Sequence, residues 1–115
     1  MAGWYEISKS DNDEVSFVLK AGNAEVILRS QQYASMASAE NGIASVQTNS
    51  SLNERYEKLD ASDGRPYFNL KAVNSQIIGT SQMYAAASGR DNGIASVEAN
   101  GSSTTIKHIA AKTTG

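Results

Sequence analysis

The sequence contains no cysteine, which excludes disulfides, thiolate nucleophiles and cysteine-based zinc sites. It has a single proline, Pro66, and a single histidine, His108. No stretch approaches the ~20 consecutive apolar residues of a membrane-spanning helix, and the first residues lack the basic segment and apolar run of a secretion signal. We therefore expect a soluble, cytoplasmic protein that does not enter the membrane.

Neither sign of charge dominates, because ten Lys and Arg residues face twelve Asp and Glu residues, for a net charge of −2. The two signs are interleaved along the chain, whereas nucleic-acid surfaces cluster Lys and Arg. The composition therefore disfavours an extensive nucleic-acid surface but leaves a local basic patch open. A chain of 115 residues is long enough for one core, so we predict a single domain over residues 1–115.

The chain is a tandem repeat. The hexapeptide Asn41-Gly42-Ile43-Ala44-Ser45-Val46 returns unchanged at residues 92–97, 51 positions later. The same shift, without any gap, aligns Tyr5-Glu6 with Tyr56-Glu57, Phe17 with Phe68, Leu19-Lys20-Ala21 with Leu70-Lys71-Ala72, Ser30-Gln31 with Ser81-Gln82, and Tyr33 with Tyr84. Ungapped correspondence predicts two repeats, 4–51 and 55–102, that share one backbone path.

Each repeat opens with signals for three strands. In the first, residues 4–8 precede a turn at 10–13, residues 15–21 alternate apolar and polar, and residues 25–29 form the third strand. Gly22-Asn23 predicts a hairpin corner, with Asn23 and its equivalent Asn74 as the left-handed residues. In the second repeat Pro66 suits the first residue of a strand.

The period then changes to that of a helix. Met36, Ala39, Ile43 and Val46 follow one another at spacings of three, four and three, which predicts a helix from the N-cap Ser35 to about Asn49. The second repeat keeps the same phase over residues 87–97. Each helix contains an interior glycine, at a cost of ~1 kcal/mol, so we expect a neighbour packed closely against it.

The tail continues the pattern. Residues 106–109 have the phase of residues 4–7 and 55–58, so we predict a closing strand over 104–110. The predicted order is three strands, a helix, three strands, a helix and a strand.

The Ser-Gln-x-Tyr motif, the run of small residues, the hexapeptide and a closing Asn, repeated after about 50 positions, resemble the YegP-like family of small uncharacterised prokaryotic proteins. The resemblance covers nearly the whole chain. It implies an α+β fold of two β-β-β-α repeats plus a C-terminal strand, on one continuous, mainly antiparallel sheet with two helices on one face and exchanged C-terminal strands. It also implies a monomer with internal pseudo-two-fold symmetry. It supplies no catalytic residues, and Asn23-Ala24 and Asn74-Ser75 stand where the family pattern leads us to expect Asn-Gly.

Candidate chemical groups each have an ordinary structural interpretation. His108 has no copy and no cluster of acidic residues beside it, so we expect an exposed or edge-strand role. Glu6 and Glu57 would form an acid-base pair if both lay near the pseudo-dyad, but strand charges facing solvent are favoured. Lys20 and Lys71 suit cross-strand salt bridges. We predict no catalytic residue, no metal site and no cofactor.

The motif residues have two interpretations. Tyr33 and Tyr84 either line a polar pocket with an amide or are half-buried rings bonded at the strand-to-helix corner, and we favour the second. Their repeated polar neighbours are expected to serve helix packing or solvation; these are Asn41, Asn92, Ser45 and Ser96.

The sheet face away from the helices is the main candidate for function. Its expected residues include Ser16, Ile27 and Ile78, and the predicted binding set is Trp4, Val18, Lys20, Tyr67, Asn69 and Lys71. This mixture of apolar, aromatic and charged groups favours a non-enzymatic module that binds a protein or peptide through the face or an edge strand. The alternative is single-stranded nucleic acid on the same face, stacked on Trp4 and Tyr67. An unrecognised enzyme is the third hypothesis.

Overall fold

A computed structural model describes residues 3–10 and 12–109 and shows the predicted succession of elements. In chain order these are β1 (Trp4–Lys9), β2 (Val15–Lys20), β3 (Val26–Ser30), α1 (Met36–Asn49), a 3₁₀ turn (Asn53–Arg55), β4 (Tyr56–Asp60), β5 (Pro66–Lys71), β6 (Ile77–Thr80), α2 (Ala87–Asn100) and β7 (Ile106–Ile109). Asp11 of the predicted first turn and Ala110 of the predicted closing strand lie outside the described residues.

All seven strands form one sheet, in the order β4-β5-β6-β3-β2-β1-β7. Every neighbouring pair is antiparallel except β1 and β7, which are parallel. The repeats meet between β3 and β6, where Arg29 pairs with its own equivalent, Thr80, and so marks the pseudo-two-fold axis. The last strand follows the helix of the second repeat yet joins the first repeat, so the predicted exchange of the C-terminal strand is confirmed.

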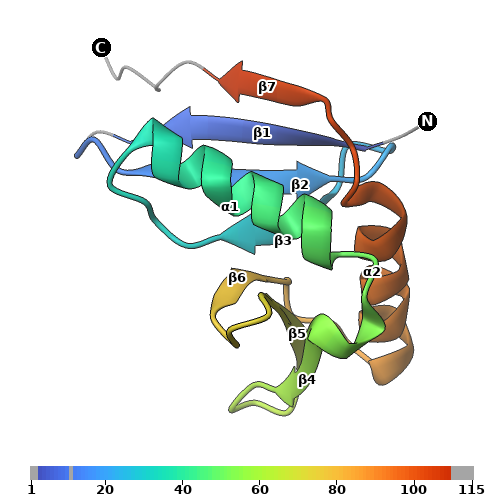
Figure 1. The fold of residues 1–115 in the computed structure, drawn as a ribbon. Coiled ribbons are helices and arrows are strands. Elements are labelled where there is room, and N and C mark those ends of the chain that lie inside the picture. Colours follow the sequence, from blue (N-terminus) through green and yellow to red (C-terminus); the bar gives the residue numbers. More distant parts are fainter. Residues whose placement is uncertain (1–2, 11, 110–115) are drawn as a thin grey trace.

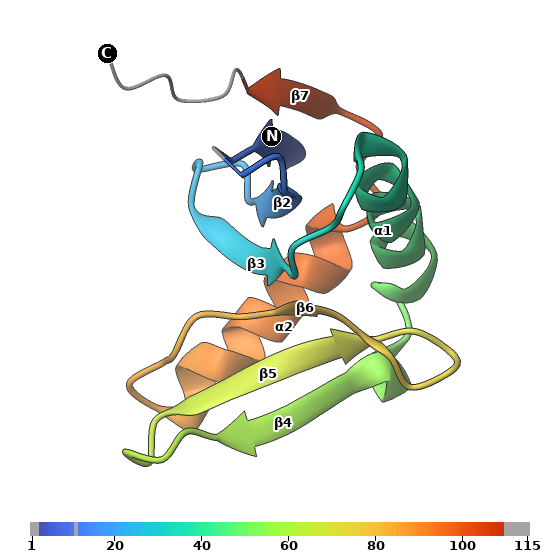
Figure 2. The same ribbon diagram turned by 90° about the vertical axis from the view of Figure 1, so that its left-hand side faces the viewer.

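Both helices lie on the same side of this sheet. The sheet curves from β7 at the top of Figure 2 to β4 at the bottom, and α1 and α2 lie within the curve. Figure 1 shows the same arrangement from the side, with α1 crossing over β2 and β3. Each helix contacts strands of both repeats: α1 packs on β2 and β6, and α2 packs on β5 and β3. The outer side of the curve is left open. Within the described residues, neither helix has the length and apolar character needed to cross a bilayer.

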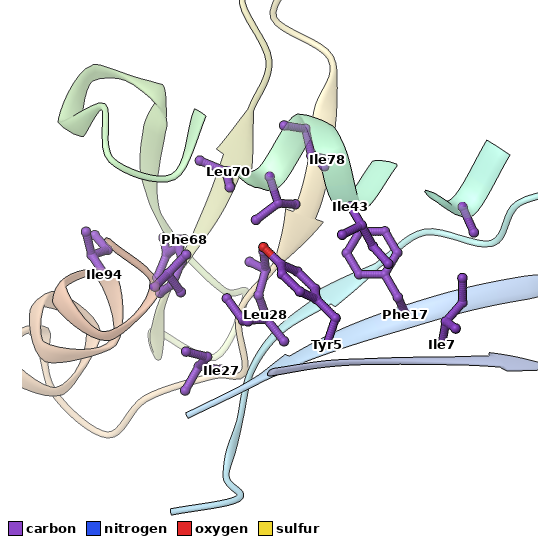
Figure 3. Packing of buried hydrophobic residues seen from close by; sticks show 14 of the residues in the cluster. Tyr5, Ile7, Phe17, Ile27, Leu28, Ile43, Phe68, Leu70, Ile78 and Ile94 are labelled. Atoms are coloured by element: carbon purple, nitrogen blue, oxygen red, sulfur yellow. The ribbon is translucent and has the colours of Figure 1, made fainter. Parts of the chain in front are cut away.

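The core lies between the helices and the inner face of the sheet (Figure 3). It is built twice over from the same aromatic triplet. Phe17 makes an edge contact with Tyr5, with ring centroids 5.9 Å apart, and stacks on Tyr33 at 6.2 Å. Phe68 repeats both contacts, with Tyr56 at 5.6 Å and Tyr84 at 6.4 Å. The apolar members that complete the buried cluster are Ile7, Val15, Leu19, Ile27, Leu28, Ala39, Ile43, Val46, Leu70, Ile78, Ile94 and Val97.

The first helix begins and ends where its sequence predicts. The Ser35 hydroxyl caps it by accepting a 3.1 Å hydrogen bond from the Ser38 amide. The expected close neighbour of the interior glycine is also present, because a Cβ on Gly42 would lie 2.9 Å from both Phe17 Cε2 and Tyr33 Cζ. The glycine is therefore required where the stacked rings meet the helix.

The left-handed residue of the β2–β3 hairpin is not the predicted one. Positive φ occurs at Ala24 (70°) and at its equivalent Ser75 (69°), one position after the asparagines. The loop is a turn closed by the hydrogen bond from Ala24 N to Ala21 O, followed by a left-handed residue. The Asn23 carboxamide instead accepts a 3.1 Å bond from the Glu25 amide, and Asn74 repeats this bond with Gln76. Side-chain bonding, not backbone freedom, thus accounts for the repeated asparagine.

The prediction that Ile27 and Ile78 face outward is wrong. Both side chains are buried, with exposed fractions of 7% and 5%. The pairing of β2 with β3 shifts after Leu19, and that of β5 with β6 shifts after Leu70, so each third strand carries a β-bulge. The extra residue of each bulge breaks the alternation that the sequence prediction assumed, and its side chain turns into the core.

Candidate functional site: the open face of the sheet

The outer face of the sheet presents a continuous row of side chains across both repeats. Cross-strand pairing places them in the order Glu57, Asn69, Thr80, Arg29, Val18 and Glu6. A second row, toward one end of the strands, contains Lys71 paired with Ile77, and Val26 paired with Lys20. The outer face therefore runs without interruption over the pseudo-dyad, and the predicted binding residues on β2 and β5 lie on it.

Arg29 occupies the middle of this face and was missed by the sequence analysis. It is exposed, between Val18 on one side and Thr80 on the other. Among the described residues, no carboxylate lies within ion-pair distance of its guanidinium. The equivalent residue in the second repeat is a threonine, so comparison of the two repeats did not single out Arg29. Its outward position in the third predicted strand was the only signal in the sequence.

The predicted lysines form cross-strand salt bridges, as expected. Lys20 Nζ lies 3.2 Å from Glu6 Oε1, and Lys71 Nζ lies 3.1 Å from Glu57 Oε2. These two pairs occupy opposite halves of the sheet, on β1–β2 and on β4–β5. Glu6 and Glu57 are therefore far from the pseudo-dyad and cannot share a proton, so the hypothesis of a carboxylate pair is wrong.

Each glutamate is stabilised as a carboxylate. The hydrogen bond from the Trp4 indole Nε1, 2.9 Å long, is the main cause that lowers the pKa of Glu6, and Lys20 adds to it. The hydrogen bond with Lys71, supported by the Asn69 amide, lowers the pKa of Glu57. The lowered pKa values favour the ionised form of both carboxylates, which is the form that their ion pairs with the lysines require.

The two predicted aromatic residues lie at different parts of the face. Trp4 is on β1, and the Lys107 ammonium of β7 lies 4.3 Å from its ring centroid, so a cation covers one side of the ring. Tyr67 is on β5, half-buried, in the other repeat. Asn69, on the same strand, is only 6% exposed, and its carboxamide oxygen accepts a 2.8 Å bond from the Thr80 hydroxyl. Asn69 therefore orders its neighbours more than it offers a free contact.

The other candidate groups lie away from this row. His108 is exposed on β7, opposite Ile7. Within the described part of the chain, no three His, Cys, Asp or Glu residues gather as metal ligands. Tyr33 and Tyr84 face the helices, with their rings against the interior glycines. The open face thus combines apolar contacts, ion pairs and one central cation, a composition suited to binding a surface or an extended segment.

Comparison with known proteins places this architecture in a family. The model of the family described as "Domain of unknown function (DUF1508)" matches the chain twice, at residues 10–57 and 61–107. UPF0339 protein YegP of Shigella flexneri is 64% identical over 107 residues, covering 93% of this chain and 97% of that protein. A UPF0339 protein of Shewanella oneidensis is 62% identical over 109 residues, covering 95% of this chain and 99% of that protein.

A solved structure agrees with the fold. The solution NMR structure of yegP from E. coli, itself titled a protein of unknown function, matches with a TM-score of 0.90 and 62% identity. The match covers 96% of this chain and 95% of that one. The resemblance inferred from the repeated motif is confirmed: the chain belongs to the DUF1508 family, as a tandem of two DUF1508 repeats similar to the UPF0339 protein YegP.

Proposed function

We propose that the protein is a non-enzymatic binding module that holds an acidic, extended segment of a protein partner on the open face of its sheet. The observation that carries the proposal is the exposed Arg29 guanidinium at the centre of that face, which has no ion-pair partner among the described residues. A guanidinium with free donors binds a carboxylate through two parallel hydrogen bonds. A partner carboxylate at this point would be bound next to Val18 and Thr80.

Charge complementarity supports an acidic partner. The face carries four cations, Lys20, Arg29, Lys71 and Lys107, against the two carboxylates Glu6 and Glu57. The whole chain, in contrast, has a net charge of −2. A locally positive face on an acidic protein attracts negative segments and orients their approach.

Shape and apolar contacts favour an extended protein segment over a small substrate. The face is the outer side of a curved sheet and so does not enclose a ligand (Figure 2). Val18 and Tyr67 are half-buried, and Ile77 is 45% exposed, so apolar groups lie beside the cations. The edge strand β4 is a weaker candidate, because its Glu57, Lys58 and Asp60 are charges of the kind that discourage strand addition.

The test starts from randomised short peptides displayed on phage and selected on the immobilised protein. We expect the selected peptides to be rich in Asp and Glu. Arg29→Ala should weaken their binding by about tenfold or more, because it removes a charge-assisted contact. The double variant Val18→Asp with Tyr67→Asp should abolish binding while the fold persists. Arg65→Ala is the matched control, since this exposed arginine lies in the β4–β5 turn, off the open face.

Two outcomes would overturn the proposal. One is equal peptide binding by wild type, Arg29→Ala and the folded double variant. The other is preferential binding of mixed single-stranded oligonucleotides, with an affinity that falls steeply as salt rises, which would favour the nucleic-acid alternative on Trp4 and Tyr67. As part of the same proposal the module is a cytoplasmic monomer, which cell fractionation and sedimentation test directly.

A further inference from the structure

The repeated motif residues line two matching pockets on the helix side of the molecule. Of the residues named above on the open face, only Ile77 also lines one of them. The pocket of the first helix has a volume of about 200 Å³ and the pocket of the second about 220 Å³. Equivalent residues line both; they are Gln31, Tyr33, Asn41, Gly42 and Ser45 in one, and Gln82, Tyr84, Asn92, Gly93 and Ser96 in the other. We propose that each pocket binds one small, neutral ligand that carries several hydroxyl groups, such as a monosaccharide or a polyol.

Each pocket is assembled from both repeats. Ala72, Gln76 and Ile78 of the second repeat close the pocket of α1. Ala21, Glu25 and Ile27 of the first repeat close the pocket of α2. The bulges described above place Ile27 and Ile78 on this side of the sheet. A pocket therefore exists only when the two repeats are docked across the pseudo-dyad.

Several polar groups in these pockets have no hydrogen-bond partner among the described residues. Within the described residues, the Gln31 and Asn41 carboxamides and the Tyr33 hydroxyl make no hydrogen bond to another residue. Asn92 is likewise exposed and without a hydrogen-bond partner there. Asn41 and its equivalent Asn92 are present in both repeats although no hydrogen bond among the described residues uses either carboxamide.

Other repeated polar residues do have a structural role. Asn49 Nδ2 donates a 2.8 Å bond to Ser45 O, and Asn100 repeats it with Ser96 O at 2.7 Å. The Ser30 hydroxyl accepts a 2.8 Å bond from the Phe17 amide. The sequence keeps these residues because the backbone needs them. The carboxamides of Asn41 and Asn92 make no such bond among the described residues, so both are available to a ligand bound in the pockets.

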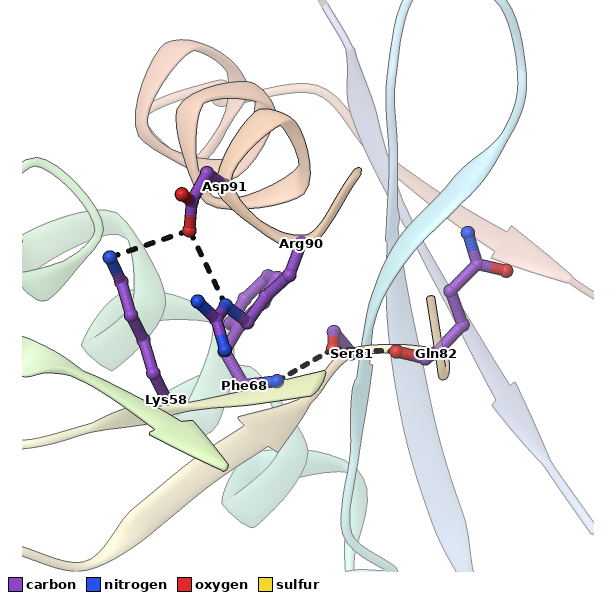
Figure 4. Close-up of polar contacts among 6 residues, drawn as sticks. All are labelled: Lys58, Phe68, Ser81, Gln82, Arg90 and Asp91. Atoms are coloured by element: carbon purple, nitrogen blue, oxygen red, sulfur yellow. Dashed lines mark hydrogen bonds and ion pairs between the residues drawn. The ribbon is translucent and has the colours of Figure 1, made fainter. Parts of the chain in front are cut away.

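The second pocket shows how the fold presents such a group. Ser81 Oγ accepts a 3.0 Å bond from the Phe68 amide and donates a 2.8 Å bond to Gln82 O, which fixes the chain after β6. Figure 4 shows this anchor and the Gln82 side chain extending from it. Gln82 and Tyr84 line this pocket together, so the amide and the phenol belong to one site. Burial is the main cause that raises the pKa of the Tyr84 phenol, and Gln82 opposes that rise.

The chemistry of the lining selects the ligand. Carboxamides and hydroxyls both donate and accept hydrogen bonds, as do the hydroxyls of a sugar. Several such groups around one pocket suit a ligand with several hydroxyls, whereas a single amide ligand would satisfy only some of them. Among the described residues the α1 pocket has no charged lining residue, so an ion placed there would lose hydration without gaining a counter-charge. The α2 pocket has one, the carboxylate of Glu25, which repels an anion. Pockets for drug-sized ligands hold roughly 300–1,000 Å³, so these smaller ones suit a single ring.

The test is an NMR titration of the labelled protein with D-glucose, D-ribose and glycerol, followed through the carboxamide signals of Gln31, Asn41, Gln82 and Asn92. We expect saturable shifts at these signals with dissociation constants of about millimolar, as small ligands with few contacts give. Glucose 6-phosphate and acetamide are the charged and the single-amide controls. Asn41→Ala should remove the shifts of Gln31 while those of Gln82 and Asn92 remain. Asn92→Ala should do the reverse, so each pocket is the control for the other.

Every other result contradicts the proposal. Absence of saturable shifts with all three neutral probes rejects the site. Shifts that neither alanine variant changes place binding elsewhere. Equal binding of glucose 6-phosphate rejects the requirement for a neutral ligand, and binding of acetamide alone rejects the requirement for hydroxyls.

Discussion

The Tyr5 hydroxyl donates a 2.6 Å hydrogen bond to the carbonyl oxygen of Gly101, at the end of the helix that belongs to the other repeat. The equivalent Tyr56 hydroxyl donates an identical 2.6 Å bond to Ser50 O, at the end of α1. Both phenols have a raised pKa because they are buried. Each repeat therefore fixes the C-terminus of its neighbour's helix, and the two halves are stabilised together.

The pseudo-dyad brings equivalent residues into contact, and at two places one of them is a glycine. Leu28 packs against its equivalent, Gly79, so closely that a Cβ added to Gly79 would lie 2.8 Å from Leu28 Cγ. Ser50 fills the space beside its equivalent Gly101 in the same way. Two large side chains at one point of the axis would collide. The tandem chain avoids this collision because its two copies are free to differ.

We predict that Gly101→Ala lowers the free energy of unfolding by about 1–3 kcal/mol, because the added methyl group has no room beside Ser50. Its backbone is right-handed, so alanine adds no backbone strain there. Ser50→Gly in the same chain should restore part of the loss, since it vacates the space and removes a buried hydroxyl without a partner in the described structure. Urea unfolding of the four proteins measures this coupling. An unchanged effect of Gly101→Ala in the Ser50→Gly background would contradict it.

Two glycines of the second helix should respond to alanine with opposite signs. At Gly93 a Cβ would lie 2.7 Å from Tyr84 Cζ, so Gly93→Ala should destabilise by about 1–3 kcal/mol. At Gly89 the nearest atom is at an ordinary 3.4 Å, so Gly89→Ala should stabilise by up to ~1 kcal/mol through helix propensity. Thermal unfolding of both variants checks the pair. A stabilised Gly93→Ala protein would show that the tyrosine ring moves away at little cost.

The hairpin corners should be stabilised by glycine. Ala24 and Ser75 have positive φ, which costs about 1–2 kcal/mol for a residue with a Cβ. Glycine removes this cost but has a larger conformational entropy in the unfolded chain. Ala24→Gly and Ser75→Gly should therefore each raise the free energy of unfolding by about several tenths of a kcal/mol. Gly64, at a φ of 86° in the other turn, supplies the reverse experiment. Gly64→Ala should lose about 1 kcal/mol. Chemical denaturation measures all three, and a destabilised Ala24→Gly protein would refute the strain argument.

The two glutamates of the open face should make the free energy of unfolding depend on pH in the acidic range. The pKa values of Glu6 and Glu57 are lower in the folded protein, so the unfolded chain binds protons first as the pH falls. The contribution of the two carboxylates to folding stability is therefore complete above the unfolded pKa of about 4.3. It is lost as the pH falls through the folded pKa values. Trp4→Phe should raise the pKa of Glu6 alone, because the residue equivalent to Trp4 in the second repeat is Arg55. An NMR titration of the glutamate carboxyl carbons measures both groups. Equal movement of Glu57 would mean that the indole bond is not the cause.

Local features of the chain followed from the sequence because they depend on neighbours close along it. The apolar spacing gave the bounds of α1, from Met36 to Asn49, and the cap at Ser35. The ungapped duplication predicted two units of one fold, and the glycine inside each helix correctly predicted a residue packed closely against it. Even the tail strand could be predicted, since its phase repeats that of β1 and β4.

Only the tertiary structure decided what happens between the repeats. The shift in pairing after Leu19 turned Ile27 inward, and it depends on a partner strand that local periodicity does not reveal. The strand order separated Glu6 from Glu57 and placed Arg29 at the centre of the open face. The pockets also need residues of the two repeats to approach one another across an axis. Such long-range pairing depends on how the whole sheet buries its core, so no stretch of sequence contains it alone.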